Sequence, residues 1–179
     1  MDFLWYSSVL QNNDNLEQGD FVPDCPIVIP PDSIIENKQI DVEINLIDSI
    51  VLSQSCDLFN NNIDIVLVCP YYSLKAFLQL IPEEQTKTSK ARSKTIDNLR
   101  KGFLPGYHLL NKQEGFFNDY QVVDFRNVYG ININSLKSIC RKLPNRVRLM
   151  PPYREHLSQS FARYFMRVGL PQDIIIEGY

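Results

Sequence analysis

The chain has 179 residues, of which 44% are hydrophobic and 22% charged, and its formal net charge is −3. This composition is typical of one globular domain and excludes a disordered, collagenous or coiled-coil chain. The longest apolar runs, such as Ile65–Cys69, are much shorter than the roughly 20 residues that span a bilayer. We therefore expect a single cytoplasmic domain over residues 1–179, with no membrane segment.

Charge is distributed unevenly along the chain. Residues 1–80 contain two lysines and twelve acidic residues, whereas residues 81–179 contain sixteen Lys and Arg and nine acidic residues. The second half therefore has a net charge of +7. This asymmetry indicates either a basic surface for phosphate groups or attraction between the two halves within one fold.

The four cysteines lie at wide and irregular spacings without a CxxC pair. That pattern indicates reduced thiols in a cytoplasm and excludes a zinc ribbon. The sequence also lacks the GxGxxG, Walker, HExxH and GxSxG patterns of common cofactor and catalytic sites. We therefore expect no cofactor and no metal, and the sequence leaves open whether the chain is an enzyme.

The first predicted strand follows an N-terminal segment, residues 1–17. Gly19-Asp20 is typical of a turn, and it leads into a strand that begins at Phe21. Four prolines within residues 23–31 exclude a helix there. They restrict strand pairing in this segment to sheet edges or bulges.

Two neighbouring core strands are predicted next. Asp41–Leu46 alternates apolar and polar side chains, which indicates a strand with one solvated face, and β-branched residues continue it through Ile47–Ser53. Ile63–Cys69 is the clearest buried strand, and we expect it to end at Pro70. A short polar connection joins the two strands.

The second half begins with a helical insertion, residues 74–101. Leu74–Ile81 has helical spacing, and Glu83–Lys101 predicts a second helix with many Lys and Arg but few apolar anchors. We therefore expect this second helix to be exposed, mobile or bound to a partner. The later predicted elements are a hairpin of Tyr107–Asn111 with Tyr120–Phe125, a strand at Asn127–Ile131, a helix at Ser135–Lys142, a strand at Arg146–Met150, and an amphipathic helix over residues 151–168 followed by a tail to residue 179.

The polar run from Ser53 to Asp57 is the first candidate site, because functional side chains are often placed where strands end. Cys56 is a candidate nucleophile, Asp57 a candidate carboxylate, and His108 the candidate base that would generate the thiolate. The alternative is that Cys56 is packed as a small hydrophobe and Asp57 caps a turn. A metal site of Asp20, Cys56, Asp57 and His108 is chemically possible, but no short ligand spacing supports it.

Basic residues of the second half are candidates for contacts with nucleic-acid phosphates. We select Arg100, Lys101, Arg146 and Arg148, which lie in a half that also contains aromatic side chains able to stack on bases. The alternative is that these cations are only solvated and that the aromatic residues belong to the core.

Three segments carry a resemblance to a known family. Gly19-Asp20-Phe21-Val22, Ser49-Ile50-Val51-Leu52-Ser53 and Ile65–Ser73 resemble the front half of the MazF/PemK-like toxins. The resemblance implies a small SH3-like β-barrel, usually dimeric, that cuts single-stranded RNA without a metal. The run from Ser53 to Asp57, with the Gly-Asp start, is also similar to uncharacterised bacterial proteins that have a Ser-Gln-x-Cys-Asp strand end.

The chain departs from the toxin pattern at two positions. Asp48-Ser49 stands where the toxins have Arg-Pro, and Tyr72-Ser73 stands where they have Thr-Ser. The arginine that would stabilise the reacting phosphate is therefore missing at that position. The resemblance thus supports the fold more than the activity, and it implies a degenerate or divergent endoribonuclease.

Together these observations predict a mainly β, α+β fold: a partly open SH3-like barrel over residues 18–150, with a basic helical insertion and a C-terminal amphipathic helix. The leading functional hypothesis is a toxin-like or defence-associated module that interacts with single-stranded RNA. One alternative is a noncatalytic protein-interaction subunit that binds a partner through the insertion or the C-terminal helix. Another is a cysteine-dependent hydrolase that uses Cys56 and His108. The resemblance also implies a homodimer.

Overall fold

The computed structural model describes residues 4–10, 15–33 and 41–166. The strands in these ranges are β1 (Tyr6–Leu10), β2 (Phe21–Ile29), β3 (Glu43–Val51), β4 (Ile65–Ser73), β5 (Tyr107–Leu110), β6 (Gln121–Asp124), β7 (Tyr129–Asn132) and β8 (Asn145–Leu149). The helices are α1 (Ser55–Phe59), α2 (Leu74–Leu80), the 3-10 helix η1 (Glu83–Gln85), α3 (Ser89–Arg100), α4 (Ile133–Lys142) and α5 (Tyr153–Phe165). None of the helices in the described ranges has the length and apolar character needed to cross a bilayer.

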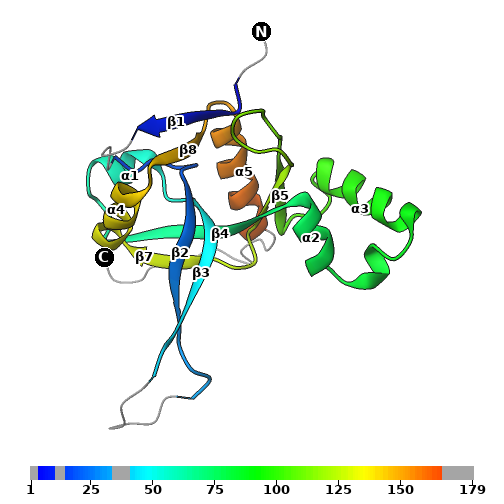
Figure 1. Cartoon of the computed structure of the whole chain (residues 1–179), viewed down its shortest axis with the longest axis horizontal. Helices are drawn as coiled ribbons and strands as arrows, with labels where there is room; N and C mark the ends of the chain where they lie inside the picture. Colours follow the sequence, from blue (N-terminus) through cyan, green and yellow to red (C-terminus); the bar gives the residue numbers. More distant parts are fainter. Residues whose placement is uncertain (1–3, 11–14, 34–40, 167–179) are drawn as a thin grey trace, which may run out of the picture.

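Antiparallel pairing organises the strands into two sheets (Figure 1). The larger sheet has the order β2-β3-β4-β6-β5, and β7 also pairs with β4. β6 and β7 follow one another along β4, since Tyr71 lies opposite Val123 and Val68 lies opposite Tyr129. β1 pairs with β8 in the smaller sheet.

The two sheets meet where the turn before β2 contacts β8. Asp20 and Arg148 form an isolated antiparallel bridge, and the Leu149 amide donates to the Gly19 carbonyl at 2.9 Å. Gly19 has a φ of +84°, and a Cβ atom at this position would lie 2.9 Å from the Leu149 Cβ. Both the left-handed backbone and the close approach of β8 therefore require glycine here.

On the other side, β1 contacts the end of β5 through side chains. The Tyr6 hydroxyl donates to the Asn111 carbonyl at 2.5 Å, and the Gln113 Oε1 accepts the Trp5 amide at 2.9 Å. No ladder between β1 and β5 is present in the described ranges. The described strands thus leave the barrel open at this seam, and the predicted mixed α+β fold with a partly open barrel is confirmed.

Side chains from the two faces of the larger sheet enter two different cores. Phe21 and Ile50 belong to an aromatic cluster against which α5 packs with Leu157. Their chain neighbours Val22 and Val51 belong to an aliphatic cluster that α1 and α4 cover, with members such as Leu136. Successive residues of a strand point to opposite faces, so the alternation in the sequence becomes two cores.

The helical insertion packs on the sheet through a third, smaller core. Leu99 of α3 is buried against Phe77 and Ile81, and Val122 of β6 completes the cluster. The Ser73 Oγ accepts the Ala76 amide and caps α2. The predicted pair of helices is therefore present, but the second helix begins at Ser89, where the Thr88 side chain caps it, and not at Glu83, which lies in the separate 3-10 helix η1. Thr95 and Leu99 are the buried residues of α3.

The structure differs from the sequence prediction on both sides of the connection between β3 and β4. The polar run after β3 contains the helix α1, which is too short to show a helical period. β4 continues through Pro70 to Ser73, although we expected it to end at the proline. On the edge of β4 that faces β6 and β7, Pro70 lies between the residues that pair with β7 and those that pair with β6. The backbone N–H that proline lacks is therefore not needed for pairing on this edge.

The other predicted elements are present with small shifts. The hairpin is confirmed, because β5 and β6 pair with Tyr107 opposite Asp124. The helix expected at Ser135–Lys142 begins two residues earlier, where the Asn132 side chain caps it. The C-terminal helix is α5, and the last residues predicted for it, 167 and 168, lie outside the described residues. β1 is a strand that the sequence did not predict.

Candidate functional site

A cavity of about 450 Å³ lies between the end of α3, the strand β5 and the helix α5. Three cationic side chains and two histidines line it, and none of its lining residues is Asp or Glu. The lining residues are Leu99, Arg100, Lys101, Gly102, Pro105, Tyr107, His108, Leu109, His156, Gln159, Ser160 and Arg163. We call it the basic cavity. Its lining is suited to an anionic group, because the lining residues carry positive charge and no negative charge.

Arg100 and Lys101 stand where α3 ends. Both pair with Asp97 one turn earlier, at 2.8 Å from the Arg100 Nη2 to Oδ1 and 2.6 Å from the Lys101 Nζ to Oδ2. Hydrogen bonds from Lys101 and Arg100 lower the pKa of the Asp97 carboxyl. All three side chains are accessible to solvent. Exposed ion pairs of this kind contribute little stability, so a phosphate oxygen can take the place of the Asp97 carboxylate.

The helix α5 presents the opposite wall of the basic cavity. His156, Ser160 and Arg163 follow one another at intervals of four and three residues, which places them on one face of the helix. Arg163 is exposed, and it forms no ion pair with a described residue. Its guanidinium is therefore available to a ligand.

His108 of β5 is partly buried in the wall of the basic cavity. Its ring stacks on Phe125, with 6.2 Å between the ring centroids. Burial, and to a smaller extent the charge of His156, lowers the pKa of His108 to about 4. At neutral pH the His108 imidazole is consequently uncharged, and one of its nitrogens can accept a proton. His156 is exposed in the same cavity.

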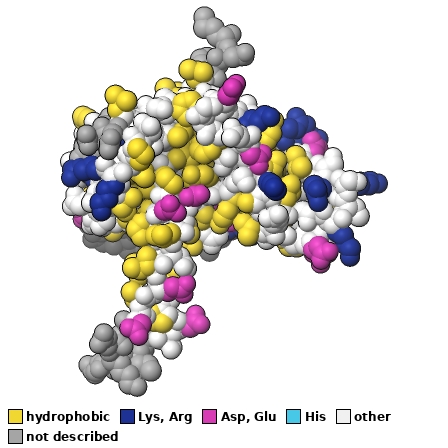
Figure 2. Space-filling view, in the orientation of Figure 1, with side chains coloured by type: hydrophobic (Ala, Val, Ile, Leu, Met, Phe, Trp, Pro, Cys, Tyr) yellow, Lys and Arg dark blue, Asp and Glu magenta, His cyan; other side chains and the backbone are white. Residues whose placement is uncertain are grey.

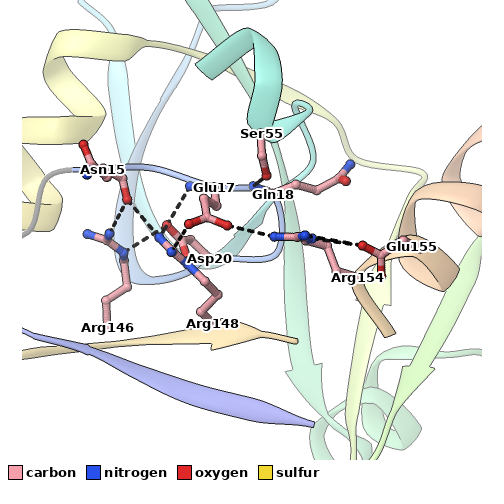
Figure 3. Close-up of polar contacts among 9 residues, drawn as sticks. All are labelled: Asn15, Glu17, Gln18, Asp20, Ser55, Arg146, Arg148, Arg154 and Glu155. Carbon is pink, nitrogen blue, oxygen red and sulfur yellow. Dashed lines mark hydrogen bonds and ion pairs between the residues drawn. The ribbon is translucent and has the colours of Figure 1, made fainter. Parts of the chain in front are cut away.

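Arg146 and Arg148 of β8 lie elsewhere, in a network of buried charges (Figure 3). Asp20 is fully buried, and it forms ion pairs with Arg148, at 2.5 Å from the Nε, and with Arg146, at 3.1 Å from the Nε. Arg148 also pairs with Glu17. Arg146 is only 2% exposed. Both guanidinium groups are thus occupied by carboxylates of the protein itself.

The network extends to α5 through a third arginine. The Arg154 Nη1 lies 2.8 Å from the Glu17 Oε2, so Glu17 stands between Arg148 and Arg154 (Figure 3). These contacts join the turn before β2 to β8 and α5. We assign Arg146 and Arg148 to this internal contact, and the phosphate-binding candidates that remain accessible are Arg100 and Lys101.

Cys56 lies on α1 and is exposed, and its Sγ donates to the Gln54 Oε1 at 3.7 Å. It lines two further cavities, of about 360 and 560 Å³. His108 lines neither of them, and the smaller one shares only Gln159 with the basic cavity. Asp57 on the same helix lines none of these cavities. The structure therefore does not bring Cys56 and His108 into one site.

Within the described ranges, no group of three or more His, Cys, Asp and Glu side chains is placed to hold a metal ion. Asp20, one of the four residues considered for such a site, is enclosed by arginines instead.

Sequence reasoning missed His156 and Arg163 as partners of His108. The sequence contained a sign of this grouping. His156, Ser160 and Arg163 are spaced so that they form one polar face of a helix whose other face is apolar. The sequence does not show that this face of α5 lies close to β5 and to the end of α3.

A scan against models of known protein families finds no match, and a search of curated proteins finds no relative. The similarity to MazF/PemK-like toxins therefore stays a prediction.

Proposed function

We propose that the protein binds single-stranded RNA, with backbone phosphates held in the basic cavity. The observation that carries this proposal is the set of three cations, Arg100, Lys101 and Arg163, around a cavity lined by no carboxylate. Lys and Arg supply most of the affinity of proteins for nucleic-acid backbones. The cavity volume lies in the range of roughly 300–1,000 Å³ that is typical of ligand sites.

An aromatic side chain beside the basic cavity favours a single strand. Phe103 directly follows Gly102 of the lining and is 68% exposed. Tyr107 is itself part of the lining. Unpaired bases stack on such rings, whereas the bases of a duplex are already stacked on one another. A single strand can therefore place a phosphate in the cavity and a base on Phe103.

The test is the affinity of the protein for a fluorescently labelled RNA oligonucleotide, measured by anisotropy over a series of salt concentrations. The variant Arg100→Ala/Arg163→Ala removes two cations from the basic cavity. Its matched control, Lys75→Ala/Lys142→Ala, removes two exposed cations that line none of the cavities described above. We expect the cavity variant to bind more weakly and its salt slope to fall by about 1.4, since each phosphate contact with a single strand contributes about 0.7.

Two results would contradict the proposal. One is the absence of binding by the unmodified protein at about 50 mM salt, where electrostatic binding is favoured. The other is an equal loss of affinity in the cavity variant and in the control variant, because this would locate no site. Circular dichroism spectra of both variants must match the unmodified protein.

Cleavage of the bound RNA is a second candidate function, favoured by the two histidines of the basic cavity. An uncharged His108 can accept the proton of a ribose 2′-hydroxyl as that oxygen attacks phosphorus. A protonated His156 can donate a proton to the departing 5′-oxygen. The products would be a 2′,3′-cyclic phosphate and a 5′-hydroxyl, which balances protons and electrons without a co-reactant.

The test of cleavage uses His108→Ala and His156→Ala with an RNA and a DNA of the same sequence, in the presence of a chelator. We expect each variant to abolish cleavage while retaining RNA affinity, and we expect the DNA to stay intact because it lacks the 2′-hydroxyl. Cleavage that persists in both variants would overturn this assignment. Binding without cleavage by the unmodified protein would leave RNA binding as the function.

This proposal places the protein in the cytoplasm as a toxin-like or defence-associated module, in line with the similarity of its strands to MazF/PemK-like toxins. Growth of a bacterial host after induced expression of the protein tests that context, and expression of the Arg100→Ala/Arg163→Ala variant is the control.

We do not propose a cysteine-dependent hydrolase, because Cys56 and His108 line different cavities.

A further inference from the structure

The strands β2 and β3 continue beyond the body of the protein as a two-stranded arm (Figure 1). Pairing of β3 with β4 ends at Ser49, opposite Pro70, whereas pairing of β2 with β3 continues to Ile29, opposite Glu43. We define the arm as residues 23–33 and 41–48. A two-stranded ribbon is marginally stable by itself, so a partner that packs on the arm would stabilise it.

One face of the arm is apolar and exposed. Val28 lies opposite Ile44, and Pro26 lies opposite Leu46, which places these four side chains on the same face. Val28 is 56%, Ile44 59% and Leu46 64% exposed. The other face packs on the aliphatic core through Cys25 and Ile27. An exposed apolar strip bordered by polar residues is typical of an interaction surface.

The arm is also acidic. All its carboxylates are exposed, and they belong to Asp24, Asp32, Asp41, Glu43 and Asp48. None of them forms an ion pair with a described residue, and neither range of the arm contains Lys or Arg. Asp24 and Asp48 are adjacent, since the Asp24 amide donates to the Asp48 Oδ1 at 3.2 Å. A partner of the arm must therefore supply both apolar side chains and positive charge.

The helical insertion of the same chain carries exposed cations and an exposed apolar side chain. The helix α3 and the turn before it carry exposed cations that form no ion pair with a described residue, namely Lys87, Lys90, Arg92 and Lys94. Figure 2 shows Lys and Arg side chains gathered over the helical insertion, whereas the described side chains of the arm are hydrophobic, acidic or uncharged. Leu80, the last residue of α2, is an exposed hydrophobic residue.

The arm and the insertion project from different sides of the body, so within one chain they are held apart (Figure 1). We propose that two copies of the chain form a dimer in which the arm of each copy lies on α3 of the other. Both surfaces are present on every chain, so one two-fold axis can satisfy both contacts at once and close the assembly. Stable interfaces bury about 800 Å² per partner, and the reciprocal exchange adds two contacts toward that area.

The dimer goes beyond the RNA-binding proposal and is tested without RNA. The mass of the protein in solution is measured by sedimentation at low and high salt, over a range of protein concentrations. The arm variant is Asp24→Lys/Asp48→Lys, and the insertion variant is Lys90→Glu/Arg92→Glu. A third chain combines all four substitutions and restores the opposite charges. The control is Glu114→Lys/Lys142→Glu, which changes exposed charges outside both surfaces.

We expect a dimer for the unmodified protein and for the control, with an affinity that falls as salt screens the charges. The arm variant and the insertion variant should each dissociate at least tenfold more readily. The combined chain should form a dimer again, which also shows that the substitutions leave the fold intact. A monomeric unmodified protein, a dimer that both single-surface variants retain, or a combined chain that stays monomeric would each overturn the proposal.

Discussion

The buried carboxylate of Asp20 receives two hydrogen bonds from the guanidinium of Arg148, from Nε at 2.5 Å and from Nη2 at 3.0 Å. The two residues are 128 positions apart in the chain. Their contact ties the turn before β2 to β8, at the place where the two sheets meet. A residue that the sequence suggests for phosphate binding is therefore one of the links that hold the barrel together.

The first prediction concerns this link. Replacing Asp20 by Asn removes the charge that faces Arg146 and Arg148 and leaves two guanidinium groups without their shared carboxylate. We expect the free energy of unfolding, measured with urea, to fall by about 3–5 kcal/mol, which is typical when one partner of a buried pair is removed. The control is Glu155→Gln, which removes an exposed and longer contact to Arg154. Equal, small losses in both variants would contradict a stabilising role for Asp20.

The second prediction separates backbone strain from close packing at Gly19. Gly19 and Gly115 have nearly equal φ values, +84° and +83°, but only Gly19 has atoms within 4 Å of the place that a Cβ would occupy. We expect Gly115→Ala to cost about 1–2 kcal/mol, because a non-glycine residue is strained in the left-handed region. Gly19→Ala should cost clearly more, since its Cβ would collide with that of Leu149. Similar unfolding curves for the two variants would show that the approach of β8 is not tight.

The third prediction concerns the dependence of stability on pH. The pKa of His108 lies at about 4 in the folded protein and near 6.5 in the unfolded chain, so between these values the unfolded chain binds the proton more tightly. The contribution of His108 to stability is therefore fully present above about pH 6.5 and is lost as the pH falls toward 4. We expect His108→Gln to flatten the loss of stability in this window, as measured by thermal unfolding. Parallel pH profiles for the variant and the unmodified protein would contradict this.

The fourth prediction concerns the cysteines. Cys56 is exposed, whereas Cys69 is fully buried and its pKa is raised to about 12 by that burial. Because the thiolate is the reactive form and must be reached by the reagent, we expect the native protein to react rapidly at one thiol. Mass spectrometry after labelling should identify that thiol as Cys56, and Cys56→Ser should remove the rapid reaction. Labelling of Cys69 at the same rate would show that β4 opens readily.

Much of the fold follows from the sequence because its signals are local. The alternation in Asp41–Leu46, the apolar run in Ile63–Cys69 and the three-and-four spacing after Pro152 each report on neighbouring residues, and each led to the correct type of element. The elements that were missed have weak local signals. α1 is only five residues long, and β1 is stabilised by its pairing with β8, which comes from the other end of the chain.

The charges show what the sequence by itself determines and what it leaves to the tertiary structure. The charged residues of the sequence determine that the second half of the chain is basic. They do not distinguish the role of Arg100 from that of Arg148. Folding places Arg148 beside the buried Asp20, and it places Arg100 at a cavity whose other walls come from His108 and Arg163. A charge acts through the groups that surround it in space, and these come from distant parts of the chain. Only the tertiary structure therefore decides which arginines hold the barrel together and which are free to meet a ligand.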